Sequence, residues 1–170
     1  MKFILTLLRK SYSFAIITDK TSYCVAVTTG GIEMAVISEL IRSEADGTIS
    51  FGDYTLADKK KLEDFKHDGD LYKVKTFSDI TKLERNGMFV YESVPGTAVE
   101  KFNCTSDSVS FTVEGKGDAM ITLELEPETN YDITVAGNSA GQMKTNLGGK
   151  LNLSVELDPG VAVLVEVKRV

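Results

Sequence analysis

The chain is 170 residues long, carries a formal net charge of −6 and is 42% hydrophobic. This length allows one or two domains, and the apolar fraction supplies a core, which argues against a disordered chain. The acidic balance argues against a nucleic-acid-binding protein, because such proteins usually present a basic surface. A net negative charge of this size is typical of a β-rich protein, in which repulsion between molecules maintains solubility.

Residues 1–33 differ in composition from the remainder of the chain. Four basic residues accompany two acidic ones there, a balance of +2, so the remainder carries −8. The apolar run Phe3–Leu8 is shorter than a secretory signal needs, and no run reaches the length of a membrane-spanning helix. We therefore expect an N-terminal extension, with Met34 opening the domain, no membrane segment and a cytoplasmic protein. A signal peptide is the alternative.

Three dipeptides typical of tight hairpin turns lie in the middle of the chain: Asp46-Gly47, Asp68-Gly69 and Asn86-Gly87. A type I′ turn needs positive φ at both central positions, which these residue types adopt at little cost. The first turn predicts that residues 41–44 pair with residues 48–51. Residues 55–65 also begin like a capped helix, but their apolar stripe is thin, and we favour a strand over residues 61–66.

The turns also predict which side chains face each other across the strands. A two-residue loop at Asp68-Gly69 sets Phe65 opposite Tyr72 and Asp64 opposite Lys73. This register gives one aromatic pair and one pair of opposite charges, each of which stabilises a sheet.

The Asn86-Gly87 turn makes the same kind of prediction. It sets Glu84 opposite Phe89, Leu83 opposite Val90 and Lys82 opposite Tyr91, with Leu83 and Val90 on one buried face.

From residue 99 onward, apolar and polar residues alternate in runs separated by glycine-rich turns. The last run, residues 161–167, is apolar on both faces and is expected to be central and covered on both sides. The whole pattern predicts an all-β fold with little helix, in which antiparallel hairpins feed an immunoglobulin-like or jelly-roll-like β-sandwich. The hairpin region would span 34–94 and the sandwich region 98–170, or 34–170 would form one domain.

One segment carries a family resemblance. Leu125, Pro127 and Tyr131, within residues 125–141, resemble the tyrosine corner of fibronectin type III and immunoglobulin-like domains. The resemblance implies a corner between two strands, in which the tyrosine hydroxyl bonds back to nearby backbone. The tryptophan expected in an early strand is missing. The C-terminal half also looks like accessory β-sandwich modules of bacterial surface and carbohydrate-active proteins, which implies a bacterial source.

The residues that usually carry catalysis are sparse. His67, the single histidine, adjoins a predicted turn and is expected to be a solvated turn residue, with a general base or a metal ligand as the alternative. Cys24 and Cys104 match no disulfide framework or zinc spacing, and Cys104 is expected to be an inert thiol. We therefore predict no catalytic residue, metal or cofactor. A hydrolase that uses two carboxylates remains an alternative.

Five aromatic residues could stack on sugar rings: Phe51, Tyr54, Tyr72, Phe89 and Tyr91. A cross-strand aromatic cluster explains them as well. The sequence predicts a non-catalytic binding or assembly protein that self-associates through its sheet edges, since unpaired edges invite another strand. A glycan or protein partner is open, and a carbohydrate-binding module at the cell surface is the alternative. No nucleic-acid or membrane partner is expected.

Overall fold

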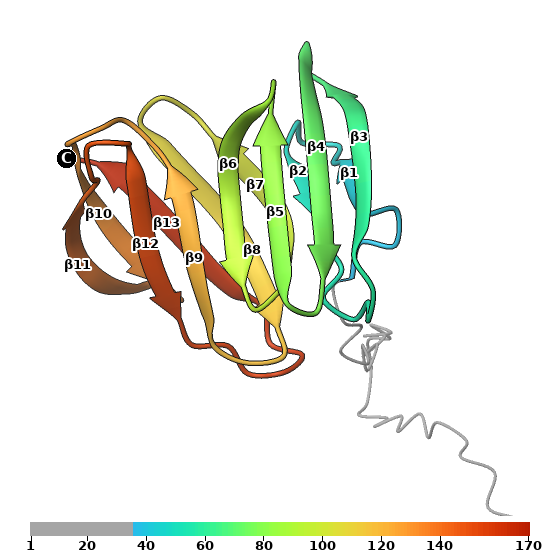
Figure 1. Cartoon of the computed structure of the whole chain (residues 1–170). Coiled ribbons are helices and arrows are strands. Elements are labelled where there is room, and N and C mark those ends of the chain that lie inside the picture. The colour runs from blue at the N-terminus through green and yellow to red at the C-terminus, as the bar shows by residue number, and fades with distance from the viewer. Residues whose placement is uncertain (1–35) are drawn as a thin grey trace, which may run out of the picture. The chain divides into compact units, whose positions relative to one another are not determined.

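The computed structural model describes residues 36–170 and places them in two antiparallel β-sheets (Figure 1). The predicted all-β class and two-sheet sandwich are confirmed, and these residues contain no helix. Nothing in this part of the chain could therefore cross a membrane as a helix. The expected extension over residues 1–33 and the start at Met34 lie outside the described residues.

One sheet has seven strands, in the spatial order β1 (Ile41–Ser43), β2 (Ile49–Phe51), β7 (Thr97–Cys104), β8 (Ser108–Gly115), β13 (Val163–Arg169), β10 (Asn130–Val135) and β11 (Asn138–Lys144). The other has six, in the order β12 (Lys150–Val155), β9 (Ala119–Glu124), β6 (Met88–Val94), β5 (Ile80–Arg85), β4 (Asp70–Phe77) and β3 (Lys60–His67). β2 pairs with β7, and β6 pairs with β9. Strands from regions 34–94 and 98–170 therefore share both sheets.

The core lies between the inner faces of the two sheets. Alternate residues of each strand point inward, and the following ones of β8 and β12 are at most 2% exposed: Val109, Phe111, Val113, Leu151, Leu153 and Val155. An aromatic cluster joins the sheets at the centre. The ring of Tyr91 on β6 meets those of Phe51, Phe102 and Phe111 edge-on, at centroid distances of 5.3, 6.2 and 5.6 Å. The core therefore contains Phe51 and Tyr91, two of the five aromatic residues that were candidates for stacking on sugar rings.

Two of the three predicted turns have the expected backbone. Both Asp68 and Gly69 have positive φ, as do Asn86 and Gly87. At Asp46-Gly47 only the glycine does, with φ at +83°. The amide of Glu44 there donates to the carbonyl of Thr48 at 2.8 Å. The first hairpin loop is therefore longer than a two-residue turn, and its glycine adopts the left-handed conformation at the end.

A bulge changes the predicted register of β3. Phe65 lies opposite Tyr72, as expected, but the pairing shifts between Leu62 and Phe65. The prediction that Asp64 faces Lys73 is wrong, because Asp64 lies in the bulge with φ at +58°. Lys73 pairs instead with the carboxylate of Glu63 at 3.3 Å. The extra residue bends the strand and interrupts its ladder.

A second bulge lies on β6. Glu84 faces Phe89 as predicted, but Leu83 faces Tyr91 rather than Val90. Lys82 consequently faces Glu92 rather than Tyr91. The additional residue allows both Val90 and Tyr91 to be buried, whereas strict alternation would expose one of them.

The last strand, β13, occupies a central position between β8 and β10. The prediction that both its faces are covered is wrong, since Leu164 on its outer face is 45% exposed. The apolar run correctly indicated a strand here. The apolar side chains on its outer face, however, do not mark a further layer of structure packed over the sheet.

Hydrogen bonds to carboxylates should make the fold sensitive to acid. The pKa of four carboxyl groups is lowered by such bonds: Glu44, Asp46, Glu63 and Glu84. For Glu44 the main cause is the hydroxyl of Ser50, followed by the guanidinium of Arg42. A group whose pKa is lower in the folded state stabilises the fold above its unfolded-state pKa, and this contribution is lost on acidification.

We therefore expect the free energy of unfolding to fall as the pH drops below about 4.5, the ordinary pKa of a glutamate, because the unfolded chain then takes up protons before the folded carboxyls do. Urea denaturation at a series of pH values measures it. The variant Glu44→Gln should show a shallower dependence than the wild type. Equal stability at neutral pH and at about pH 3 would contradict the expectation.

Candidate functional site

The five aromatic residues proposed as a sugar-stacking row do not form one. Four of them are buried in the sandwich core: Phe51, Tyr54, Tyr72 and Tyr91. Phe89 is partly exposed on β6, and the ammonium of Lys150 lies 4.1 Å from its ring centre, in cation–π geometry. A single ring covered by a lysine offers no row of faces to a glycan.

A buried network of hydroxyl groups links the two sheets. Thr97 on β7 is its centre, and its Oγ1 lies 2.9 Å from the hydroxyl of Tyr91 and 2.8 Å from that of Ser93. The hydroxyl of Thr81 donates to the Thr97 carbonyl at 2.7 Å and lies 2.8 Å from the hydroxyl of Thr76. Every member has a hydrogen-bond partner, so the network can be buried without the cost of unpaired polar groups. The role of this hydroxyl network is therefore to stabilise the contact between the two sheets.

Tyr54 and Glu114 form a second buried polar contact. The Tyr54 hydroxyl donates to a carboxylate oxygen of Glu114 at 2.7 Å. Burial, with this bond and the charge of Glu114, raises the pKa of Tyr54. The phenol therefore stays protonated and continues to donate its hydrogen bond.

His67 was expected to be a solvated turn residue, and this expectation is wrong. Its side chain is only 11% exposed, at the end of β3. One ring nitrogen, Nδ1, lies 2.8 Å from the hydroxyl of Ser43 on β1, and the other, Nε2, lies 3.0 Å from the carbonyl of Gly47. An Nε2–H donor and an Nδ1 acceptor satisfy both contacts. His67 therefore fastens the edge of one sheet to the β1–β2 hairpin of the other.

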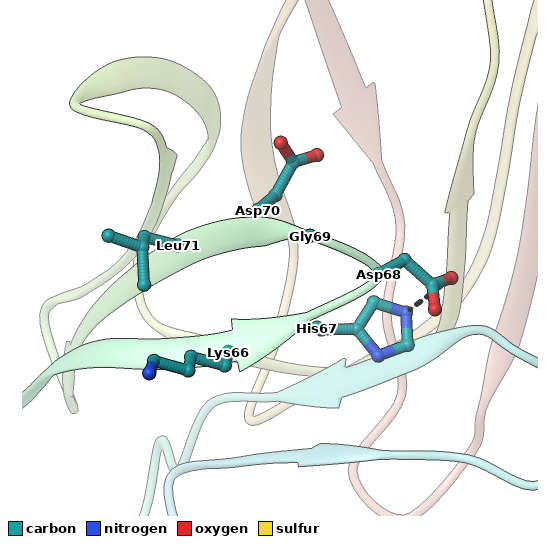
Figure 2. Close-up of a pocket in the computed structure, with 6 residues that line it drawn as sticks. All are labelled: Lys66, His67, Asp68, Gly69, Asp70 and Leu71. Carbon is teal, nitrogen blue, oxygen red and sulfur yellow. Dashed lines mark ion pairs between the residues drawn. The ribbon is translucent and has the colours of Figure 1, made fainter.

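A hollow of about 280 Å³ lies at the tip of the β3–β4 hairpin, between residues 66 and 71 (Figure 2). The side chains around the hollow point in different directions. His67 points toward the β1–β2 hairpin, while Asp70 and Leu71 point away from that hairpin. The one contact between polar side chains among them joins Nε2 of His67 to a carboxylate oxygen of Asp68, at 3.4 Å. Without polar groups that converge on one point, the hollow lacks the usual character of a ligand site.

The remaining candidate residues also take structural roles. Cys104 is half-buried, and burial raises the pKa of its thiol, which disfavours the nucleophilic thiolate. Cys24 lies outside the described residues. Within residues 36–170, no three His, Cys, Asp or Glu side chains gather closely enough to hold a metal ion.

The predicted corner connects the two sheets between β9 and β10. The hydroxyl of buried Tyr131 accepts a hydrogen bond from the amide of Glu126 at 3.3 Å. Leu125 packs against the core, and Pro127 lies at the surface between them. The backbone contact expected of the tyrosine is therefore present.

The sandwich has two flanks, each formed by one edge strand from each sheet. β1 and β3 form the first, which we call the closed flank (Figure 1). The side chain of His67 at the end of β3 contacts Ser43 of β1 and ties the two strands together. β1 has only three residues. β3 carries the bulge at Asp64 and exposed lysines at residues 60, 61 and 66. Short length, bulges and lysines are the devices by which proteins prevent another strand from pairing with an edge.

β11 and β12 form the second flank, which we call the open flank (Figure 1). β11 contains a bulge, because its register against β10 skips Ala140. β12 is different, since its six residues pair with β9 from Lys150↔Glu124 to Val155↔Ala119 without a shift. Among the edge strands of the described residues, β12 alone is both regular and longer than three residues.

The direction of the backbone groups on β12 follows from the register. The carbonyl of Gly149 accepts from the amide of Leu125, at the β9 side. In an antiparallel ladder, successive residues bond to opposite sides. The N–H and C=O groups of Leu151 and Leu153 therefore point toward β9, and those of Asn152 and Ser154 point away from the sheet. The matching groups of Lys150 are already bonded to the loop residue Asn146.

The candidate functional site is therefore this edge, which was predicted only in general terms. The signal that could have located it is the alternation of residues 150–156, with apolar side chains between exposed polar ones, a basic residue at the start and an acidic one at the end. No family model, curated protein or solved structure matches this chain.

Proposed function

We propose that this protein is a non-catalytic assembly module that associates with a second copy of itself by adding a strand at the edge of β12. The observation that carries the proposal is the contrast between the edges. β1 is short, β3 and β11 are bulged, and β12 is a regular strand with outward backbone groups at Asn152 and Ser154. Strand addition supplies affinity through these backbone groups.

An exposed apolar residue beside this edge supports the proposal. Leu147, in the loop that leads into β12, is 82% exposed, more than any other large apolar side chain of the described residues. Apolar side chains left on a surface next to an unpaired strand favour contact with another chain.

Substitution of Ser154 by proline should abolish association through this edge. The N–H group of Ser154 points away from β9, so proline removes an intermolecular donor and spares the ladder inside the sheet. We expect light scattering with size-exclusion chromatography to show a monomer for Ser154→Pro at concentrations where the wild type is associated.

The matched control is Gln142→Pro on β11, whose N–H group also points away from its own sheet. This variant should associate like the wild type. A wild-type protein that stays monomeric up to its solubility limit would overturn the proposed function. Association that survives Ser154→Pro and is lost in Gln142→Pro would move the interface to β11.

A further inference from the structure

We infer that two copies pair antiparallel along β12 about a two-fold axis at Leu153, so that Lys150 of each copy faces Glu156 of the other. This inference rests on the proposed function and specifies its interface. The observation behind it is the order of exposed side chains along the edge: Lys150, Asn152, Ser154 and Glu156 alternate with buried apolar residues.

The backbone restricts the register. Within β12, Asn152 and Ser154 are the residues whose outward N–H and C=O groups the loop at Asn146 does not already bond. A two-fold axis at Leu153 places Asn152 of each copy opposite Ser154 of the other. Each such pair exchanges two hydrogen bonds, which gives about four across the axis. A shift of the axis by one residue, to Asn152 or Ser154, would leave one such pair within β12 instead of two.

The charges agree with the same register. The axis at Leu153 brings the exposed ammonium of Lys150 opposite the exposed carboxylate of Glu156, and symmetry repeats this pair at the other end. Opposite charges at facing positions stabilise a strand pair, and like charges there destabilise it. A parallel arrangement would bring together residues of like charge. The edge is therefore complementary to itself in one orientation.

The inner faces also remain compatible with this arrangement. Leu151, Leu153 and Val155 point into the core of their own sandwich, so pairing along the edge does not move them. The six-stranded sheets of the two copies would join into one continuous sheet through β12. The partner thus needs no rearrangement of either fold, which is the condition for association without a large conformational cost.

Charge reversal tests the register. Lys150→Glu and Glu156→Lys each place like charges opposite one another at both ends, and each should weaken the dimer roughly 10- to 100-fold. The double variant Lys150→Glu/Glu156→Lys restores opposite charges and should recover most of the affinity. Sedimentation equilibrium at low ionic strength measures the dissociation constants, because salt screens such pairs.

Mixing the two single variants provides a sharper test. One copy then carries two acidic residues at these positions and the other two basic ones, so the heterodimer has attractive pairs at both ends. We expect the equimolar mixture to dimerise more tightly than either variant alone. The contact between Lys150 and the Phe89 ring is lost in both Lys150→Glu and the double variant, so recovery of affinity from the first to the second reports the intermolecular pair.

The outcomes separate the two proposals. Rescue by the double variant and by the mixture supports the register. Dimers of equal affinity in all variants would overturn this register and leave assembly through another alignment. Weakened single variants without rescue would overturn it as well. A wild-type monomer at every concentration would overturn the proposed function itself. Thermal unfolding of each variant checks the fold, which these exposed side chains should not alter.

Discussion

Replacement of Tyr91 by alanine should lower the free energy of unfolding by about 3–5 kcal/mol, the loss typical of a large aromatic side chain removed from a core. Tyr91 is fully buried, and its ring meets those of Phe51, Phe102 and Phe111, which belong to the opposite sheet. Their edge-on contacts add to the burial of apolar area. The substitution would therefore open a cavity where the two sheets meet.

The matched control is Tyr91→Phe, which keeps the ring and removes the hydroxyl. That hydroxyl bonds to Thr97, which retains its bond with Ser93, so we expect a loss of about 1 kcal/mol. Urea denaturation gives both values from the transition midpoint and slope. Similar losses in the two variants would mean that Tyr91 contributes through its hydroxyl rather than through packing.

Substitution of Gly96 by alanine should destabilise the fold by about 3 kcal/mol or more, at or beyond the upper end of what overpacking usually costs. A Cβ atom at this position would lie 2.0 Å from the carbonyl oxygen of Phe77 and 3.3 Å from the amide nitrogen of Ile80. The amide of Gly96 also donates to the carbonyl of Ser78 at 2.9 Å. The connection between β6 and β7 thus lies directly against the β4–β5 turn. A Cβ atom there would displace backbone atoms, which costs more free energy than moving a flexible side chain.

Gly117→Ala is the control for this prediction. No atom lies within 4 Å of a Cβ built there, and its φ is not in the left-handed region. It should unfold within about 0.5 kcal/mol of the wild type, or be slightly more stable because alanine restricts the unfolded chain. Thermal and urea unfolding of both variants measure the difference. Equal stability of the two variants would contradict the close approach at Gly96.

The sequence predicted the fold class because local rules decide it. Asn86-Gly87 and Asp68-Gly69 have the positive φ values that their residue types permit, and alternation along β8 and β12 assigned the inner faces. The bulges at Asp64 and Val90 were not predictable in this way. They insert one residue to fit a strand to the curvature of the sheet, which depends on the partner strands rather than on the local sequence.

The candidate edge illustrates a second limit. β11 has no apolar alternation, so the sequence did not indicate a strand between residues 138 and 144. Without β11, neither the flanks nor the position of β12 could be assigned. The prediction of a sugar-stacking row of aromatic residues was wrong for a related reason. Phe51 and Tyr91 are adjacent only because their strands meet across the two sheets, and a list of aromatic positions cannot distinguish a core cluster from an exposed row.

In the proposed assembly, the contact of His67 with the β1–β2 hairpin would limit how many copies can join. A sandwich that could add strands on both sides would polymerise into fibres, as sheet proteins do when each end offers a template. Here the imidazole of His67 bonds to Ser43 and Gly47, and these contacts join the two edge strands of the closed flank. Under the proposed pairing, β12 would be consumed, the edge at β11 is bulged, and the stoichiometry would stop at two.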